Sequence, residues 1–153
     1  MTYFPSPTAA TVDIDLAGVS GSYVAGDQMG TLITVANFAD FAGQYVSIEQ
    51  ATGMDGNAAM GPCDLYIHSA SITVASDSAA DSISDADNLT TLTRLQFGGW
   101  QASALNYHTR LLTGIPARFV CPATSVYVRV VARSTIGTIT GATVRFRLTV
   151  LKH

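Results

Sequence analysis

The last quarter of the chain contains two segments in which apolar and polar residues alternate, SVYVRVV (125–131) and TVRFRLTVLK (143–152). A period of two places successive side chains on opposite faces of a pleated strand. In both segments the even-numbered residues are apolar, from Val126 to Val130 and from Val144 to Val150. We therefore predict two half-buried strands that form the backbone of an antiparallel sheet. Residues 134–141 contain two glycines and connect the strands either as a hairpin or as a longer excursion.

The same alternation recurs at short intervals through the rest of the chain. It predicts further strands over residues 11–16, 31–35, 44–50, 63–68 (continuing or restarting at 71–74), 89–97 and 118–121. Segments rich in Gly, Pro, Asn and Ser separate them, with an expected loop over 51–62 and an expected turn over 113–116. Short strands with this punctuation are typical of an all-β, antiparallel sandwich or barrel.

Length and composition predict one domain that assembles with other proteins. A chain of 153 residues suits a single domain, which we place at 11–153, after an N-terminal extended arm at 1–10. Only 12% of the residues are charged, against roughly 25% in an average soluble domain. The surface is therefore covered by Thr, Ser, Ala and Gly, or by another protein. We expect assembly, because subunits that bury much of their surface in contacts need fewer charges.

The N-terminal arm supplies the first candidate interface residues. Pro5 and Pro7 favour an extended conformation and keep this segment out of a central strand. Chain termini are often disordered, but Tyr3 and Phe4 are poorly suited to a free tail in water. The arm is thus either a disordered end or a segment that docks on its own domain or on a neighbour. For docking, the predicted contacts are Tyr3, Phe4 and Pro5.

The charges are divided between the two halves of the sequence. All eleven acidic residues lie between Asp13 and Asp87, and all eight basic residues between Arg94 and Lys152. In Greek-key sheets early strands pair with late ones, which sets opposite charges across from each other. Alternatively, an acidic face of one subunit meets a basic face of the next. With a sequence pI of 5.4 and no dense Lys/Arg cluster, we expect no nucleic-acid partner.

Membrane insertion and secretion have no support in the sequence. No stretch approaches the roughly 18 uncharged apolar residues of a membrane-spanning helix, and the first residues lack the basic and apolar regions of a signal peptide. Cys63 and Cys121 are too far apart in sequence to suggest a metal site. They are predicted to be buried free thiols, with a disulfide between two strands as the alternative.

Four aspartates are the obvious candidates for a metal site: Asp77, Asp81, Asp85 and Asp87. Calcium requires several oxygen ligands at short distance, usually from a loop with a characteristic acidic spacing, and this spacing does not follow that pattern. We interpret residues 76–88 as a solvated segment in which Ser and Asp cap turns and a short helix near Asp85. No metal and no cofactor are expected.

Catalytic patterns are also missing. His68 and His108 are the internal histidines, and no serine lies in a nucleophile elbow that would pair with them. His68 shares a strand face with Asp64 and Tyr66, which predicts a position near solvent or an interface. Glu49 is the only glutamate, so paired carboxylates for glycoside hydrolysis have no local pattern. The sequence predicts that the protein is not an enzyme.

Trp100 is the remaining candidate site residue. It follows two glycines, and Trp is enriched among residues that dominate binding energies. A sugar-stacking platform, an interface anchor and a core residue at a strand corner are all compatible with this position. We include it as a predicted interface contact.

Several segments together resemble a family of small structural proteins from the head modules of tailed bacteriophages. They are SYVAGDQMG (22–30), DLYI (64–67), the aspartate-rich residues 77–89, and the closing strands at 126–131 and 144–151. The resemblance covers most of the chain in the family's order. It implies a jelly-roll-like β-sandwich that decorates or cements the capsid, commonly as a homotrimer where capsid subunits meet.

This resemblance implies the function that we expect. The protein would be a virion structural protein on the outer capsid surface, assembled in the host cytoplasm. Its partners would be copies of itself and the major capsid protein, and it would stabilise subunit junctions against the pressure of packaged DNA. The alternative is a receptor- or carbohydrate-binding module of a phage fibre or tail, which exposed aromatic residues lining a groove would favour.

Overall fold

The computed structural model describes residues 6–56, 59–102, 108–139 and 144–153, and almost all regular structure in it is β. The strands are β1 (Thr8–Asp15), β2 (Gly21–Tyr23), β3 (Gln28–Val35), β4 (Gln44–Asp55), β5 (Cys63–His68), β6 (Thr91–Phe97), β7 (Gln101–Ala102), β8 (His108–Cys121), β9 (Val126–Ala132), β10 (Ile136–Ile139) and β11 (Val144–Lys152). One short helix, α1 (Asp85–Asn88), lies between β5 and β6.

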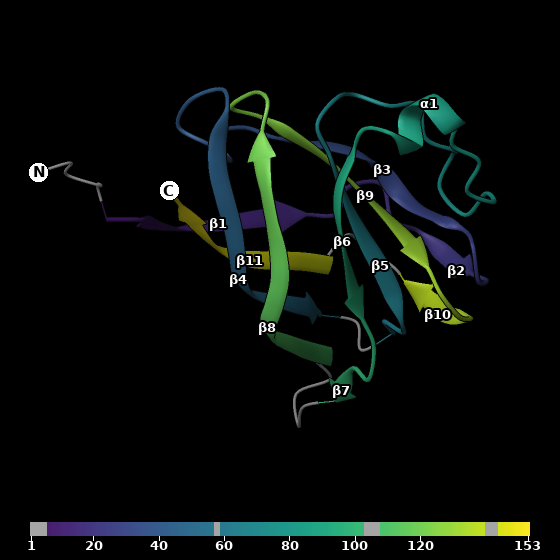
Figure 1. Ribbon diagram of the computed structural model, residues 1–153. Helices are drawn as coiled ribbons and strands as arrows, with labels where there is room; N and C mark the ends of the chain where they lie inside the picture. The colour runs from purple at the N-terminus through teal and green to yellow at the C-terminus, as the bar shows by residue number, and fades with distance from the viewer. Residues whose placement is uncertain (1–5, 57–58, 103–107, 140–143) are drawn as a thin grey trace, which may run out of the picture.

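The strands form two main antiparallel sheets (Figure 1). One has the order β1-β11-β4-β8-β7, the other β3-β9-β5-β6, and β10 pairs separately with β2. Without β2, β7 and β10, eight strands remain, and their connections cross between two four-stranded sheets at every step except the β5–β6 hairpin. This is the double Greek-key arrangement of a jelly roll. The predicted all-β, jelly-roll-like sandwich is confirmed.

The two segments that dominate the sequence pattern form opposite walls of the core. β9 lies inside the four-stranded sheet and β11 inside the five-stranded sheet. Their even-numbered residues are buried, as the alternation predicts, with Val128 and Phe146 both 0% exposed. The prediction that they pair in one sheet is wrong, because alternation specifies which side chains face inward but not which strand is the neighbour. The longer excursion, through β10, is the observed connection.

β4 and β8 continue through residues that the sequence predicts as a loop and a turn, because each pairs with neighbouring strands along its length. β4 continues to Asp55, through part of the expected loop, because β8 and β11 pair with it on both sides. The expected turn at 113–116 lies inside β8, where the register with β4 shifts between Ile48 and Gln50. Gly114 has φ +64° there, a left-handed conformation typical of a β-bulge. The Gly-Ile-Pro sequence therefore bends a strand and does not end it.

Two further boundaries differ from the sequence prediction, and one agrees with it. Residues 71–74 form no strand and belong to the connection between β5 and β6. β1 begins at Thr8, so residues 8–10, expected in the arm, pair with the end of β11. The short helix occurs where predicted, and its N-cap Ser84 accepts a hydrogen bond from the Asp87 backbone N–H.

Strand pairing brings some of the opposite charges together. Six ion pairs lie among the described residues, and two of them, Asp13–Arg147 and Asp15–Arg145, join register partners on β1 and β11. The pairs are Asp13–Arg147, Asp15–Arg145, Asp40–Lys152, Asp64–Arg94, Asp64–Arg133 and Asp81–Arg129. The Asp13–Arg147 and Asp15–Arg145 pairs set opposite charges across an early and a late strand, as the first interpretation predicts, and the second interpretation, a contact between subunits, stays a prediction.

The cysteines are free and buried, as expected. Burial raises the pKa of the Cys121 thiol to about 11 and also raises that of Cys63. Both thiols are thus protonated and inert at neutral pH. Within the described ranges, no helix is both long enough and apolar enough to cross a membrane.

Candidate functional site: the two outer faces of the sandwich

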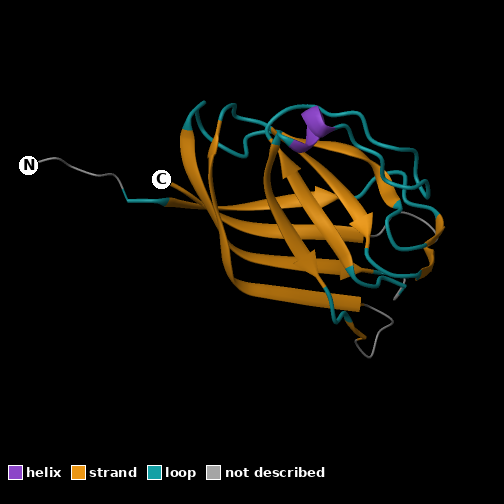
Figure 2. Ribbon diagram, turned by 45° about the vertical axis from the view of Figure 1, so that its right-hand side comes forward, coloured by secondary structure: helices purple, strands orange, loops and turns teal. Residues whose placement is uncertain are grey.

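The outer face of the four-stranded sheet is partly covered by the protein itself, while Arg94 and Gln96 on β6 stay exposed. Four of its polar residues are at most 3% exposed: Gln28, Asp64, His68 and Arg129. The cover is the segment 69–90, which carries α1 and lies over this sheet (Figure 2). It is held to β3 by backbone hydrogen bonds in both directions between Gln28 and residues 78 and 79.

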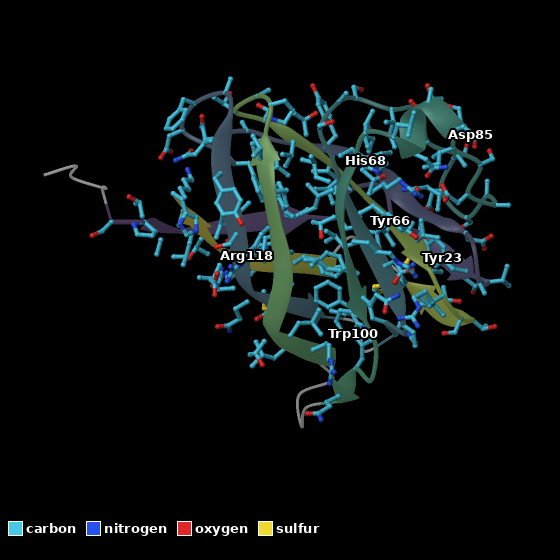
Figure 3. The ribbon with its side chains drawn as sticks, in the orientation of Figure 1. Tyr23, Tyr66, His68, Asp85, Trp100 and Arg118 are labelled. Carbon is cyan, nitrogen blue, oxygen red and sulfur yellow. The ribbon has the colours of Figure 1, made fainter. Side chains whose placement is uncertain are left out.

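Arg129 is the central polar residue under this cover. Its Nη1 donates to the Asp81 carboxylate at 2.5 Å, and its Nε donates to His68 Nε2 at 3.1 Å. Its guanidinium also lies 4.0 Å from the centre of the Tyr66 ring, a favourable cation–π distance. Figure 3 shows His68 and Tyr66 together on β5. Because Asp81 belongs to the covering segment, these contacts fasten that segment to the sheet.

The hydrogen bonds define the protonation state of His68. Nε2 accepts from Arg129, so the ring proton resides on Nδ1, which donates to Thr90 Oγ1 at 3.0 Å. Burial, and next the positive charge of Arg129, lower the pKa of His68 to about 4. The ring is 0% exposed. The expectation that His68 lies near solvent or an interface is wrong, and its contacts give it a structural role.

The aspartate-rich segment is only partly solvated. Asp77 accepts hydrogen bonds from the Tyr23 hydroxyl at 2.7 Å, the Gly30 N–H at 2.6 Å and the Ser20 N–H at 3.1 Å. Burial and the Asp77 carboxylate raise the pKa of Tyr23. Asp77 and Asp81 are therefore anchors, contrary to the prediction, whereas Asp85 is exposed. No group of His, Cys, Asp or Glu within the described ranges is arranged to hold a metal.

Among the described residues, no loop or helix lies over the outer face of the five-stranded sheet, and several of its outward side chains are exposed, although Ser47 is buried beside His153. On it lie Tyr45, Leu111 and Val120, which are 41%, 51% and 51% exposed. Tyr45 and Val120 are register partners on β4 and β8. Arg118, on the same face, is exposed and has no ion-pair partner among the described residues (Figure 3). We call this surface the bare face.

The charged edge of the bare face is neutralised within the sheet. Arg147 donates from two nitrogens to the Asp13 carboxylate at 2.7 and 2.9 Å, and Arg145 forms the same bidentate pair with Asp15. The hydrogen bond from Arg147 lowers the pKa of Asp13. An apolar patch beside charges that are already paired is suited to binding another protein, because binding leaves few charges unpaired.

A groove lies where the two sheets part, between the edge strands β1 and β3. Its volume is about 350 Å³, and residues 10–15 and 33–37 line it. The half-buried Val12 and Ile33 pack against the core at its floor. We call this the edge groove.

The predicted contacts Tyr3, Phe4 and Pro5 lie outside the described residues. Trp100 packs inward: its ring centroid is 6.1 Å from that of Phe97 and 6.3 Å from that of Phe146. It also covers Gly53, where a Cβ atom would lie 2.3 Å from the indole Cη2. These contacts match the core alternative for Trp100. The bare-face residues Leu111 and Val120 are not among the contacts predicted from the sequence, because each adjoins another apolar residue and no pattern marks which one faces outward.

Comparison with known proteins yields only distant structural likenesses. No protein-family model and no curated protein sequence matches the chain. Among solved structures, a chain of the cowpea mosaic virus top component (naturally occurring empty particles) aligns with TM-score 0.37 and 8% identity, over 99% of this chain and 46% of that one. This chain thus spans less than half of that viral chain.

Two other viral structures are similar at a lower level. A Desmodium yellow mottle tymovirus chain aligns with TM-score 0.30 and 11% identity, over 99% of this chain and 90% of that one. A marine algae virus of the order Picornavirales gives TM-score 0.23 and 11% identity, over 94% and 66% of the respective chains.

Proposed function

We propose that the protein is a non-enzymatic structural component of a virus particle, a decoration protein that binds the outer capsid surface through its bare face. The observation that carries this proposal is the difference between the two sheets. The protein's own segment 69–90 lies over part of one outer face, above the buried His68 and Arg129. The other face presents Tyr45, Leu111, Val120 and Arg118 to solvent, and Arg118 has no ion-pair partner among the described residues. Tyr and Arg are enriched among the residues that dominate protein interfaces.

The size of the bare face supports this role. Strands lie about 4.8 Å apart and rise about 3.4 Å per residue, so four strands of about nine residues cover roughly 600 Å². A stable interface buries roughly 800 Å² per partner, so one bare face supplies most of a contact. The resemblance in sequence to phage head proteins supplies the class of partner, the major capsid protein, and the homotrimeric state.

Mechanically, such a protein acts by joining neighbours. A trimer seated where capsid subunits meet buries area on each of them, so separating the subunits also requires exposing that area to water. No covalent chemistry is needed. The alternative function, carbohydrate or receptor binding, has less support, because the edge groove is lined by no aromatic residue.

Binding to undecorated capsids of the virus that encodes the chain tests the proposal. Purified protein should sediment with these capsids saturably, and electron microscopy should place it at symmetry positions. The same protein on a glycan array should give no signal. Glycan binding without capsid binding would contradict the proposal and favour the alternative.

A further inference from the structure

We propose that the edge groove receives the N-terminal arm, residues 1–7, of a second copy of this chain. This inference rests on the proposed function, because it supplies the contact that joins decoration subunits to one another. The bare face would then remain available for the capsid. Three observations carry the inference: the shape and lining of the groove, the course of the chain before β1, and the sequence of the arm.

The groove offers both apolar surface and free strand edges. β1 and β3 are each the outermost strand of their sheet, so each has backbone groups that no neighbouring strand pairs. The first part of the β3 edge is covered, since Gln28 bonds to the segment 69–90 and the Thr31 N–H donates to the Ala17 carbonyl. From Ile33 onward this edge lines the groove, opposite Val12. An open strand edge beside a groove that offers apolar contacts such as Val12 and Ile33 is a typical site for an added extended segment.

The described part of the arm, Ser6 and Pro7, leads away from its own domain. Thr8 already pairs with Lys152 as the first residue of β1, and Ser6 and Pro7 are exposed. Figure 2 shows the described chain before β1 leading away from the sandwich. Phe4 and Ser6 each precede a proline, which holds them in extended conformations and disfavours a reversal. The arm is therefore directed to a neighbour.

The length and sequence of the arm suit the groove. Seven residues span at most about 25 Å, and the six residues of β1 that line the groove span about 20 Å. In an extended arm the backbone groups of Thr2, Phe4 and Ser6 point to one side, and those of Tyr3, Pro5 and Pro7 to the other. Only the first side retains all its N–H donors. The arm can thus pair fully with one edge, while an aromatic side chain covers Val12 and Ile33.

Complementing variants of the full chain test this contact. Phe4→Asp damages the arm, and Ala10→Arg blocks the groove, because Ala10 lines it. Ala9→Arg is the matched control, since adjacent strand residues point to opposite faces and Ala9 does not line the groove. Light scattering should give an oligomeric mass for the wild type and for Ala9→Arg. It should give a monomeric mass for Phe4→Asp and for Ala10→Arg.

The decisive sample is the mixture of the two damaged variants. The Ala10→Arg variant has an unaltered arm, and the Phe4→Asp variant has an unaltered groove. Each variant alone should be monomeric, but in the mixture the arm of the first should bind the groove of the second and form a one-to-one complex. A monomeric wild type, a wild-type mass for Phe4→Asp, or no complex in the mixture would overturn the inference. Capsid sedimentation separates this failure from that of the proposed function. A wild type that binds capsids but fails these tests removes only the arm contact.

Discussion

At the scale of single residues, the best-defined feature is the buried chain Asp81–Arg129–His68–Thr90. Each polar contact in it has one donor and one acceptor, which fixes His68 as a neutral ring. The sequence alternation places Arg129 and His68 on the same side as Tyr66, and this much was predictable. Their burial was not, because it depends on the segment 69–90 folding back over the sheet, and no local pattern encodes that contact.

The neutral His68 predicts a loss of stability in mild acid. Its pKa is about 4 in the folded protein, against an ordinary value of 6.5. Between these pH values the unfolded chain binds a proton that the folded chain does not, so the free energy of unfolding falls as the pH decreases through this window. The His68 contribution is complete above about pH 6.5, and at most about 3 kcal/mol of it is lost by pH 4, since one pH unit corresponds to about 1.4 kcal/mol.

Urea unfolding of the wild type and of His68→Gln across this pH range measures the effect. The variant should show a shallower decline than the wild type. His153→Gln is the control, because His153 is exposed and its ring bonds to Ser47 and packs against Tyr45 at the sheet surface. A wild type and a His68→Gln variant with the same slope would show that His68 is not the titrating group.

A second prediction at this scale is that a side chain at Gly53 destabilises the protein. Its missing side chain is the space that the Trp100 ring occupies, so Gly53→Ala forces the ring outward, at a cost of about 1–3 kcal/mol in unfolding free energy. Gly98→Ala is the matched control, since a Cβ there meets no atom within 4 Å. Chemical denaturation followed by tryptophan fluorescence should show an altered folded-state spectrum for Gly53→Ala only. Equal stability of the two variants would contradict this packing.

At the scale of elements, strand existence was predictable and strand partnership was not. Alternating residues identified β1, β5, β9 and β11, because each has one face in the core. Gly114 and its neighbours were misinterpreted as a turn, because a bulge and a turn use the same residues and only the pairing of β8 with β4 distinguishes them. The sequence predicts a solvated segment over 76–88, because carboxylates that anchor a loop have the same sequence as carboxylates that face water.

We predict that segment 69–90 can detach from the four-stranded sheet while the rest of the sandwich stays folded. Asp77 accepts four hydrogen bonds, from the N–H and the hydroxyl of Ser20, the hydroxyl of Tyr23 and the N–H of Gly30. Asp77→Ala leaves these donors unsatisfied, with an expected cost of about 2 kcal/mol or more. Amide hydrogen exchange should become faster across the segment while β11 stays protected. Asp85→Ala, at an exposed position of α1, should leave exchange unchanged outside that helix, and similar exchange in both variants would argue against the anchor.

At the scale of the whole molecule, the jelly roll was expected from the resemblance and from the density of strands. The jelly-roll connections also explain why charges far apart in the sequence meet. They bring β1 beside β11 and so place Asp13 opposite Arg147. The bare face could not be derived from the sequence. Leu111 and Val120 each adjoin another apolar residue, and only the register tells which member of each pair faces outward.

The most direct measurement of the central claim is capsid binding by matched double variants of the full chain. Leu111→Glu with Val120→Glu places two charges on the bare face. Val24→Glu with Leu89→Glu makes the same substitutions at exposed residues, 58% and 88% accessible, outside it. In sedimentation with undecorated capsids, the first variant should stay in the supernatant, and the second should sediment like the wild type, while both keep the wild-type mass. Sedimentation of the bare-face variant at the wild-type level would contradict the claim that this protein binds its shell through the uncovered sheet.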